Sequence, residues 1–227
     1  MSVLIVAAHP DDEVLGCGGT AASFVSRGVE VRACILSGDA EARANRPETA
    51  ELLADADRAR QIVGMSPPML GRFPNINFNL VPHLELVQFI ESAVVETGAD
   101  TIFTHHPADV NDDHKHTSHA CQAAVRIFQR RPNLKPLKAL YFMEVLSATD
   151  WTFPSGDAFR ADSFAELGEE NLEKKLQALA AYRGVMRDFP HPRSREIVTG
   201  LAAYRGGQAG MRYAEAFQTA FHAIDRI

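Results

Sequence analysis

A histidine and two aspartates follow the first apolar run of the sequence. The run is Ser2–Ala8 (SVLIVAA), and His9-Pro10-Asp11-Asp12 comes directly after it. His9 and Asp12 offer a nitrogen and an oxygen donor three positions apart, so both can face one metal ion. Asp11 projects in a different direction, from which its carboxylate can reach a reacting water. Helix capping alone would explain the two aspartates but not His9.

A second polar group, rich in histidine, follows another short apolar run. Five of the nine histidines fall between His105 and His119, and three aspartates lie among them. The run Thr101–Thr104 precedes this group, so it also lies at the carboxyl end of a predicted strand. Open α/β sheets bind their ligands at that edge. We expect His116 and His119 to face solvent or to lie outside the first ligand sphere.

Two histidines and one carboxylate form a nitrogen–oxygen site that leaves coordination positions open. This pattern is typical of catalytic zinc and not of a closed structural site. Zinc lowers the pKa of a bound water to about 7 and polarises a carbonyl, while a nearby carboxylate accepts the proton. Non-haem iron uses a similar ligand set and is the chemical alternative.

The elements that must position these residues alternate between strand and helix patterns. The predicted strands are Ser2–Ala8, Glu30–Leu36, Thr101–Thr104 and Ala139–Leu146, and the predicted helices between them include Glu48–Val63, Val81–Thr97 and His114–Arg131. This alternation predicts an α/β fold, a Rossmann-like three-layer sandwich with a mostly parallel sheet flanked by helices.

The last third of the chain has a different pattern. We expect a long loop over Asp150–Leu167 and helices over Asn171–Tyr182, Ser194–Tyr204 and Met211–Ile224, with Gly206-Gly207 separating the last two. No repeat or low-complexity segment interrupts the sequence, so a single domain over 1–227 is expected.

Composition narrows the class of protein. The chain has 227 residues and a net charge of −6, which argues against a nucleic-acid or anionic-membrane surface. Its apolar runs are too short to cross a bilayer, and its amino terminus lacks the basic region of a signal peptide. The three cysteines, Cys17, Cys34 and Cys121, are widely spaced and predict reduced thiols in a cytoplasmic protein.

Two motifs carry a resemblance to a known family. Ala8-His9-Pro10-Asp11-Asp12-Glu13, followed by Leu15-Gly16-Cys17-Gly18-Gly19-Thr20, closely resembles the first motif of the zinc-dependent N-acetylglucosaminyl-phosphatidylinositol/LmbE-like (PIG-L) deacetylases. His105–His114 resembles their second motif, which ends in Asp-His. The resemblance implies zinc ligands at His9, Asp12 and His114, with Asp11 as the general base. Later segments look like a bacterial branch associated with surface-polysaccharide sugars, and they are Glu144–Trp151, His191–Ser194 and Ala214–Phe217.

The activity that this resemblance implies is removal of an N-acetyl group from an amino sugar or sugar conjugate, with release of acetate. The partner is then a small amino-sugar molecule, and the family likeness implies a homo-oligomer. Many members have a histidine at the position of Asn111, where it stabilises the oxyanion or protonates the amine. We expect His106 or His191 to take that role here. The residues expected to contact substrate are Asn111, Asp113, Glu144 and Arg193.

Several alternatives stay open at the level of sequence. The substrate can be a glycoside precursor of a thiol cofactor, the reaction can be phosphoester hydrolysis of a sugar nucleotide at two metals, or the chain can be a non-catalytic sugar-binding protein. Arg43 and Arg46 could replace a substrate-binding arginine that some relatives carry. Glu144 either faces the site or pairs with an arginine, and Trp151 is either a sugar platform or core. The glycines 16, 18 and 19 favour close helix–strand packing over phosphate binding.

Overall fold

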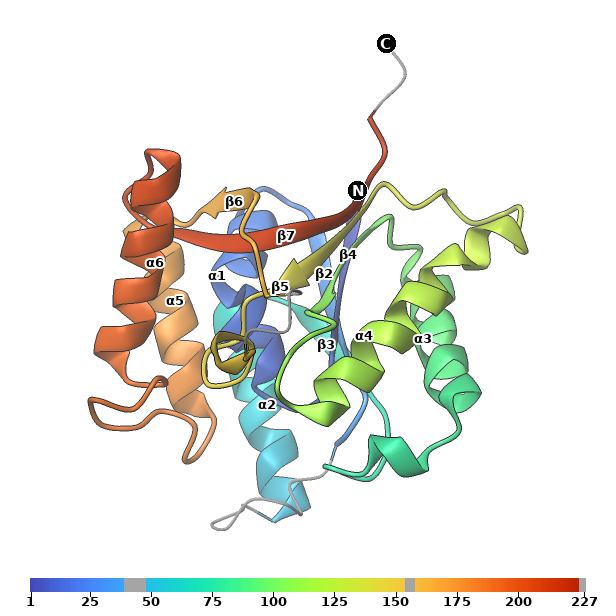
Figure 1. Cartoon of the computed structure of the whole chain (residues 1–227), viewed down its shortest axis with the longest axis horizontal. Coiled ribbons are helices and arrows are strands. Elements are labelled where there is room, and N and C mark those ends of the chain that lie inside the picture. Colours follow the sequence, from blue (N-terminus) through green and yellow to red (C-terminus); the bar gives the residue numbers. More distant parts are fainter. Residues whose placement is uncertain (39–47, 154–157, 225–227) are drawn as a thin grey trace.

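The computed structural model describes residues 1–38, 48–153 and 158–224. Within these ranges seven strands form one sheet in the order β3-β2-β1-β4-β5-β7-β6 (Figure 1). The strands are β1 (Ser2–Ala7), β2 (Glu30–Ile35), β3 (Ser66–Leu70), β4 (Thr101–His105), β5 (Ala139–Met143), β6 (Ser163–Glu166) and β7 (Ala214–His222). The pairs from β3 to β5 are parallel and only β7 pairs antiparallel, with β5 and β6. The predicted mostly parallel α/β sheet is confirmed.

The central strand β1 shows why the first motif lies where it does. Residues Val3 to Ala7 have no exposed surface, because a parallel strand covered on both faces must be apolar throughout. β1 lies between β2 and β4, and Val6 is in register with Thr104. The residues that follow β1 and β4, including His9 and His105, therefore meet at one edge of the sheet.

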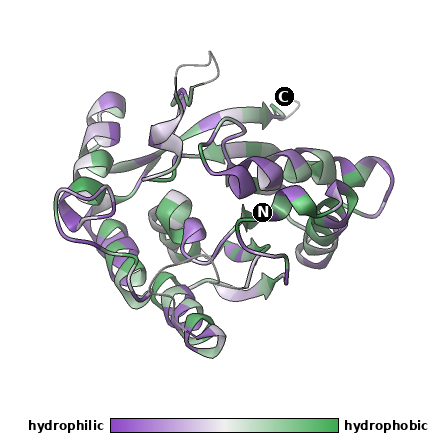
Figure 2. Cartoon of the chain, turned by 60° about the horizontal axis from the view of Figure 1, so that its bottom comes forward, coloured by the Kyte–Doolittle hydropathy of each residue, from purple (hydrophilic) through white to green (hydrophobic). Residues whose placement is uncertain are grey.

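Helices cover both faces of the sheet (Figure 1). The helices α1 (Asp12–Ser26), α2 (Thr49–Val63), α5 (Gly168–Ala181) and α6 (Arg195–Ala209) share one hydrophobic cluster, and α3 (His83–Thr97) and α4 (Asp112–Ala124) share the other. Short 3₁₀ turns lie at Phe78–Leu80, Val125–Gln129 and Thr149–Trp151. Hydrophobic and hydrophilic residues alternate along these helices (Figure 2), as amphipathic helices on a sheet require. None of the described helices has the length and apolarity needed to span a membrane.

The carboxyl-terminal third corrects two predictions. Met211–Ile224, expected as a helix, contains strand β7, which pairs with β5 and β6. α6 continues through Gly206-Gly207 to Ala209, so these glycines do not end it. Gly206 instead allows a close approach, since a Cβ there would lie 2.6 Å from the carbonyl oxygen of Met211. β3 and β6, the two outermost strands, were not predicted from the sequence.

The glycines of the first motif serve packing, as expected. A Cβ on Gly16 would lie 2.9 Å from the Met143 side chain, and one on Gly19 would lie 2.8 Å from Leu167. The same stretch of α1 contacts a buried ion pair, in which Lys175 Nζ lies 2.6 Å from Glu215 Oε1. Glu215 accepts the Gly19 amide and Lys175 donates to the Leu15 carbonyl, so the pair fixes α1 against α5 and β7.

Candidate metal centre and active site

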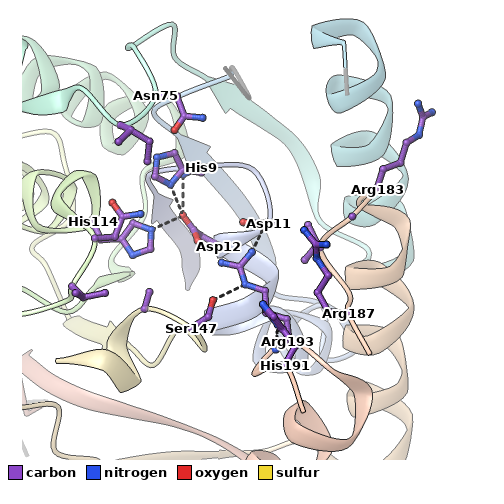
Figure 3. Close-up of a pocket in the computed structure, with 16 residues that line it drawn as sticks. His9, Asp11, Asp12, Asn75, His114, Ser147, Arg183, Arg187, His191 and Arg193 are labelled. Atoms are coloured by element: carbon purple, nitrogen blue, oxygen red, sulfur yellow. Dashed lines mark hydrogen bonds and ion pairs between the residues drawn. The ribbon is translucent and has the colours of Figure 1, made fainter. Parts of the chain in front are cut away.

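A cavity of ≈ 680 Å³ opens at the carboxyl ends of β1 and β4 (Figure 3). One side of it is formed by the segment after β1 and the start of α4. The other side comes from the turn after β5 and the loop between α5 and α6. The cavity therefore lies where the sheet topology predicts a ligand site.

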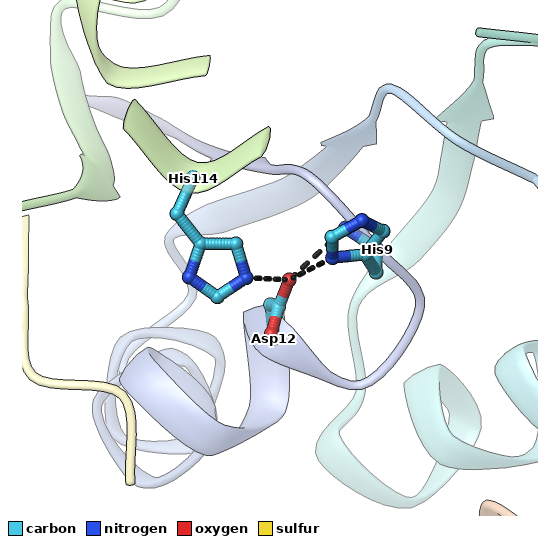
Figure 4. A group of neighbouring side chains, drawn as sticks. All are labelled: His9, Asp12 and His114. Carbon is cyan, nitrogen blue, oxygen red and sulfur yellow. Dashed lines mark hydrogen bonds and ion pairs between the residues drawn. The ribbon is translucent and has the colours of Figure 1, made fainter. Parts of the chain in front are cut away.

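His9, Asp12 and His114 converge at the base of this cavity (Figure 4). Asp12 Oδ2 lies 3.3 Å from His9 Nδ1 and 3.1 Å from His114 Nε2. One donor atom from each residue falls within 4.8 Å of the other two, and all three residues are buried. Two imidazole nitrogens and one carboxylate oxygen in this arrangement fit a zinc or iron ion with open coordination positions.

A second carboxylate orients each of the two histidines. His9 Nε2 lies 2.9 Å from Asp113 Oδ2, and His114 Nδ1 lies 3.1 Å from Asp109 Oδ2. Asp113 also accepts the amides of Ile76 and Phe78, at 2.6 Å and 3.0 Å. Carboxylates behind metal-binding histidines fix the ring and its tautomer, and so leave the opposite nitrogen free to ligate. The structure gives Asp113 this orienting position and not the substrate contact predicted for it.

The electrostatics of the cluster favour a positive charge at its centre. Burial raises the pKa of Asp12, but the neighbouring histidines, His114 foremost, together outweigh it and hold the pKa well below its usual range. Burial lowers the pKa of His114, but Asp12 and Asp109 outweigh it and raise the pKa to about 10. The buried carboxylates thus stabilise bound protons, which a metal ion displaces when it binds.

His105 lies beneath this cluster and completes its packing. Its ring stacks on His114 with centroids 3.8 Å apart, and its Nε2 accepts the Ala8 amide at 2.9 Å. Burial lowers the pKa of His105 to about 3, so the ring is neutral. His105, Asp109 and His114 form a second convergent group, but His105 and Asp109 do not line the cavity. Of the two groups, only His9, Asp12 and His114 all line the cavity, which makes them the candidate metal ligands.

Asp11 is held beside the metal cluster by contacts on two sides. Its backbone has a φ of 110°, a strained conformation for a residue with a side chain. The Glu13 carboxylate accepts the Asp11 amide at 3.0 Å, and the Tyr182 hydroxyl donates to the same carboxylate. Arg193 Nη1 lies 3.2 Å from Asp11 Oδ2. This fixed carboxylate lines the cavity next to the metal cluster, where a general base is needed.

The remaining predicted residues divide between the cavity and other regions. Asn111 and His191 line the cavity. The Asn111 side chain caps α4 by accepting the Asp113 amide at 3.0 Å. His191 is exposed at the rim, where its Nδ1 accepts the Arg193 amide at 3.0 Å.

His106 and Glu144 lie outside this cavity. His106 Nε2 lies 3.1 Å from Gln218 Oε1 and faces a separate hollow. Glu144 pairs with Arg205, whose Nε lies 2.8 Å from its Oε2, so the arginine-pairing alternative is the one found. Trp151 is 55% exposed, so its core alternative is wrong. Arg43 and Arg46 lie outside the described residues.

Sequence reasoning missed three groups that the structure brings to the site. Asp109 precedes His114 by five positions, and its place in the second motif was the available signal. Ser147 Oγ accepts from Arg193 Nε at 2.8 Å, and Arg187 lines the cavity wall. Ser147 lies in the segment Glu144–Trp151, whose family resemblance was the available signal, whereas no local pattern marks Arg187.

Comparisons with known proteins give a family match and a shared fold. The sequence profile described as PIG-L, GlcNAc-PI de-N-acetylase, matches residues 4–125, which is more than half of the chain. Among curated proteins, none matches the sequence.

Solved structures share the fold at low sequence identity. The conserved protein TT1542 from Thermus thermophilus is 24% identical, with a TM-score of 0.79, and the match covers 99% of this chain and 96% of that one. The 4-carboxy-2-hydroxymuconate hydratase GalB from Pseudomonas putida is 21% identical, with a TM-score of 0.78 and coverage of 100% and 98%. The N,N'-diacetylchitobiose deacetylase from Pyrococcus horikoshii is 18% identical, with a TM-score of 0.77 and coverage of 96% and 83%.

Proposed function

Because the chain belongs to the GlcNAc-PI de-N-acetylase family and is thus an N-deacetylase, we propose that it removes the acetyl group from an N-acetyl amino sugar or sugar conjugate in a zinc-dependent hydrolysis. The observation that carries the proposal is the cavity in which Asp11 lies beside the convergent His9, Asp12 and His114. A precursor of a surface polysaccharide is the substrate class that the sequence resemblance favours.

The residues of the cavity divide the chemical work. A zinc ion on His9, Asp12 and His114 would supply a Lewis acid that polarises the acetamide carbonyl and lowers the pKa of water. Asp11 accepts the proton of the attacking water, and Arg193 keeps the Asp11 carboxylate in place at 3.2 Å. Asp11 then carries that proton to the leaving amine.

A hydrogen-bond donor must also stabilise the oxyanion that develops on the acetyl group. His191 is the candidate in the cavity wall, because its Nδ1 accepts the Arg193 amide and the proton of the neutral ring is therefore on Nε2. Burial, with the charges of Arg193 and Arg187, lowers the pKa of His191, which favours the neutral donor. We assign the role to His191 over His106, which faces another hollow.

The fold alone does not select this reaction, since a hydratase shares it. A phosphoesterase would commonly use two bridged metals, which predicts a metal-to-protein ratio near two. The proposal predicts a ratio of one, since His9, Asp12 and His114 would hold a single ion.

The experiment is acetate release from a panel of compounds incubated with zinc-loaded protein. The panel contains N-acetylglucosamine, N-acetylgalactosamine, their nucleotide diphosphate conjugates and an N-acetylglucosamine glycoside of the thiol-cofactor type. Acetate and an equal amount of free amine from any member support the proposal. Phosphate release without acetate, or no product with two metals bound, contradicts it.

A further inference from the structure

The cavity wall across from the metal cluster carries basic side chains from one loop. This loop, residues 182–194, joins α5 to α6. It contributes Arg183, Arg187, His191 and Arg193 to the lining of the cavity (Figure 3). This short loop therefore places three guanidinium groups beside the cavity, and the three differ in their ion-pair partners within the protein.

Two of the three arginines are already paired. Arg183 forms ion pairs with Glu51 and with Asp55, whose Oδ1 lies 3.4 Å from its Nε, and its guanidinium points away from the cavity (Figure 3). Arg193 contacts Asp11 and Ser147. Both charges therefore have partners within the protein.

Arg187 differs from both. It is exposed, it lines the cavity, and its backbone amide donates to the Arg193 carbonyl at 3.2 Å. Across residues 1–38, 48–153 and 158–224 no acidic side chain forms an ion pair with it. Its charge is one cause of the lowered pKa of the rim histidine His191, after burial and Arg193.

Among the described residues that line the cavity, the acidic side chains already have partners, so none balances the charge of Arg187. Asp11 is matched by Arg193, and Asp12 is matched by the histidines or by the metal that they hold. Arg187 then adds a positive charge at the mouth of the cavity. Such a charge attracts anions and positions a phosphate or carboxylate through paired N–H donors.

We propose that Arg187 is a specificity-determining residue, which binds a phosphate or carboxylate group that the sugar substrate carries in addition to its acetamido group. The proposal rests on the deacetylase function proposed above and names the class of its substrate. The cavity has room for this additional group, because its ≈ 680 Å³ lies within the range of about 300–1,000 Å³ that encloses ligands larger than one sugar ring.

The test compares acetate release from three N-acetyl sugars by the wild-type protein and two variants, all loaded with zinc. The sugars are N-acetylglucosamine, which is neutral, N-acetylglucosamine 1-phosphate and N-acetylmuramic acid, which carries a carboxylate. The wild type is expected to prefer one of the anionic sugars in kcat/KM by roughly tenfold or more, as a charged hydrogen bond allows. Whichever anionic sugar is preferred identifies the anion.

Arg187→Gln is expected to remove this preference, mainly through a higher KM for the anionic sugar. Arg183→Gln is the matched control, because it removes the same charge from the same loop at a side chain that is already paired. If Arg187 contacts the anionic group of the sugar directly, Arg183→Gln keeps the preference for the anionic sugar. If the loop acts only through its overall positive charge, the preference falls equally in both variants. The preference should also fall as salt is raised.

Equal kcat/KM for neutral and anionic sugars in the wild type would overturn the inference, and so would a preference that survives Arg187→Gln or is lost equally in Arg183→Gln. These results leave the deacetylase function standing. Absence of acetate from these three sugars and from every member of the panel above would instead count against that function. Calorimetric binding of N-acetylglucosamine 1-phosphate then decides the inference: weaker binding to Arg187→Gln by tenfold or more supports it, and equal binding contradicts it.

Discussion

The two sides of the active-site cavity are built in different ways. The metal side consists of residues next to the buried strands β1 and β4, and each of its two candidate histidine ligands has a carboxylate behind it. The facing side is a loop between two helices, where Arg187 and His191 are exposed. The comparison indicates a fixed centre for the chemistry and a separate surface for the choice of substrate.

The two sides also differ in the residues that hold their functional side chains in place. The metal side fixes its histidines with Asp109 and Asp113, which are 0% and 1% exposed. The loop is connected to the centre mainly by Arg193, which reaches Asp11 and Ser147. Substitutions of the three candidate ligands, or of the carboxylates behind the two histidines, should therefore change metal content, and substitutions on the loop should change kinetics while the metal stays bound.

The largest effect is expected from loss of a metal ligand. His114→Gln should reduce bound zinc from about one ion per chain to nearly none and abolish acetate release, since a nitrogen ligand is lost. His119→Gln is the matched control, because His119 is an exposed histidine on the same helix. Zinc content measured by atomic absorption checks this, and equal zinc in both variants would show that His114 is not a ligand.

A smaller loss of zinc binding is expected from substitution of the carboxylates that orient the two histidines. Asp113→Asn and Asp109→Asn should each weaken zinc binding by about 10–100-fold, because an orienting carboxylate is lost. Asp112→Asn, on an exposed acid of the same segment, should leave the affinity unchanged. Competition with a chelator measures these constants. Unchanged affinity in both buried variants would contradict the orienting role.

The metal side was also the part that sequence could predict. Apolar runs such as Ser2–Ala8 mark buried strands, and the polar residues after them fall at one sheet edge by topology. His9, Asp12 and His114 converge as expected. Asp11 lies beside them as expected, and its role as base stays a prediction.

The loop side of the cavity and the outer strands could not be predicted from sequence patterns in this way. In Ala214–His222 the residues Ala214, Phe217 and Phe221 have helical spacing, and only pairing with β5 and β6 makes the segment a strand. β3 contains Pro67 and Pro68, which disfavour a strand except near a sheet edge. Ser147 and Arg187 lie in turns without a periodic pattern, so their arrival at the cavity depends on how distant elements pack.

On the loop side, Arg193→Gln should lower kcat/KM for acetate release by roughly tenfold, because Asp11 loses a charged hydrogen bond. Bound zinc should stay at the wild-type level. Arg195→Gln, which changes an exposed arginine paired with Glu173 outside the cavity, is the control. Loss of zinc in Arg193→Gln would show that the two sides are not separate.

The smallest effect on activity is expected from substitution of Glu144, a predicted site residue that lies outside the cavity. Glu144→Gln should leave zinc content and acetate release at the wild-type level, although Glu144 was expected to contact substrate. It should reduce the free energy of unfolding by about 1–3 kcal/mol, because the partly buried Arg205 loses its charged partner. Chemical denaturation and a kinetic assay measure the two quantities, and a large loss of kcat would return Glu144 to the active site.

The central claim is that Asp11 is the base beside a metal held by His9, Asp12 and His114. The most direct test measures zinc content and acetate release together in the wild type and in Asp11→Asn, with the substrate identified by the panel. The account predicts one zinc per chain in both proteins and a loss of about 10²–10⁴-fold in kcat in the variant. Full turnover by Asp11→Asn with zinc bound would contradict the account.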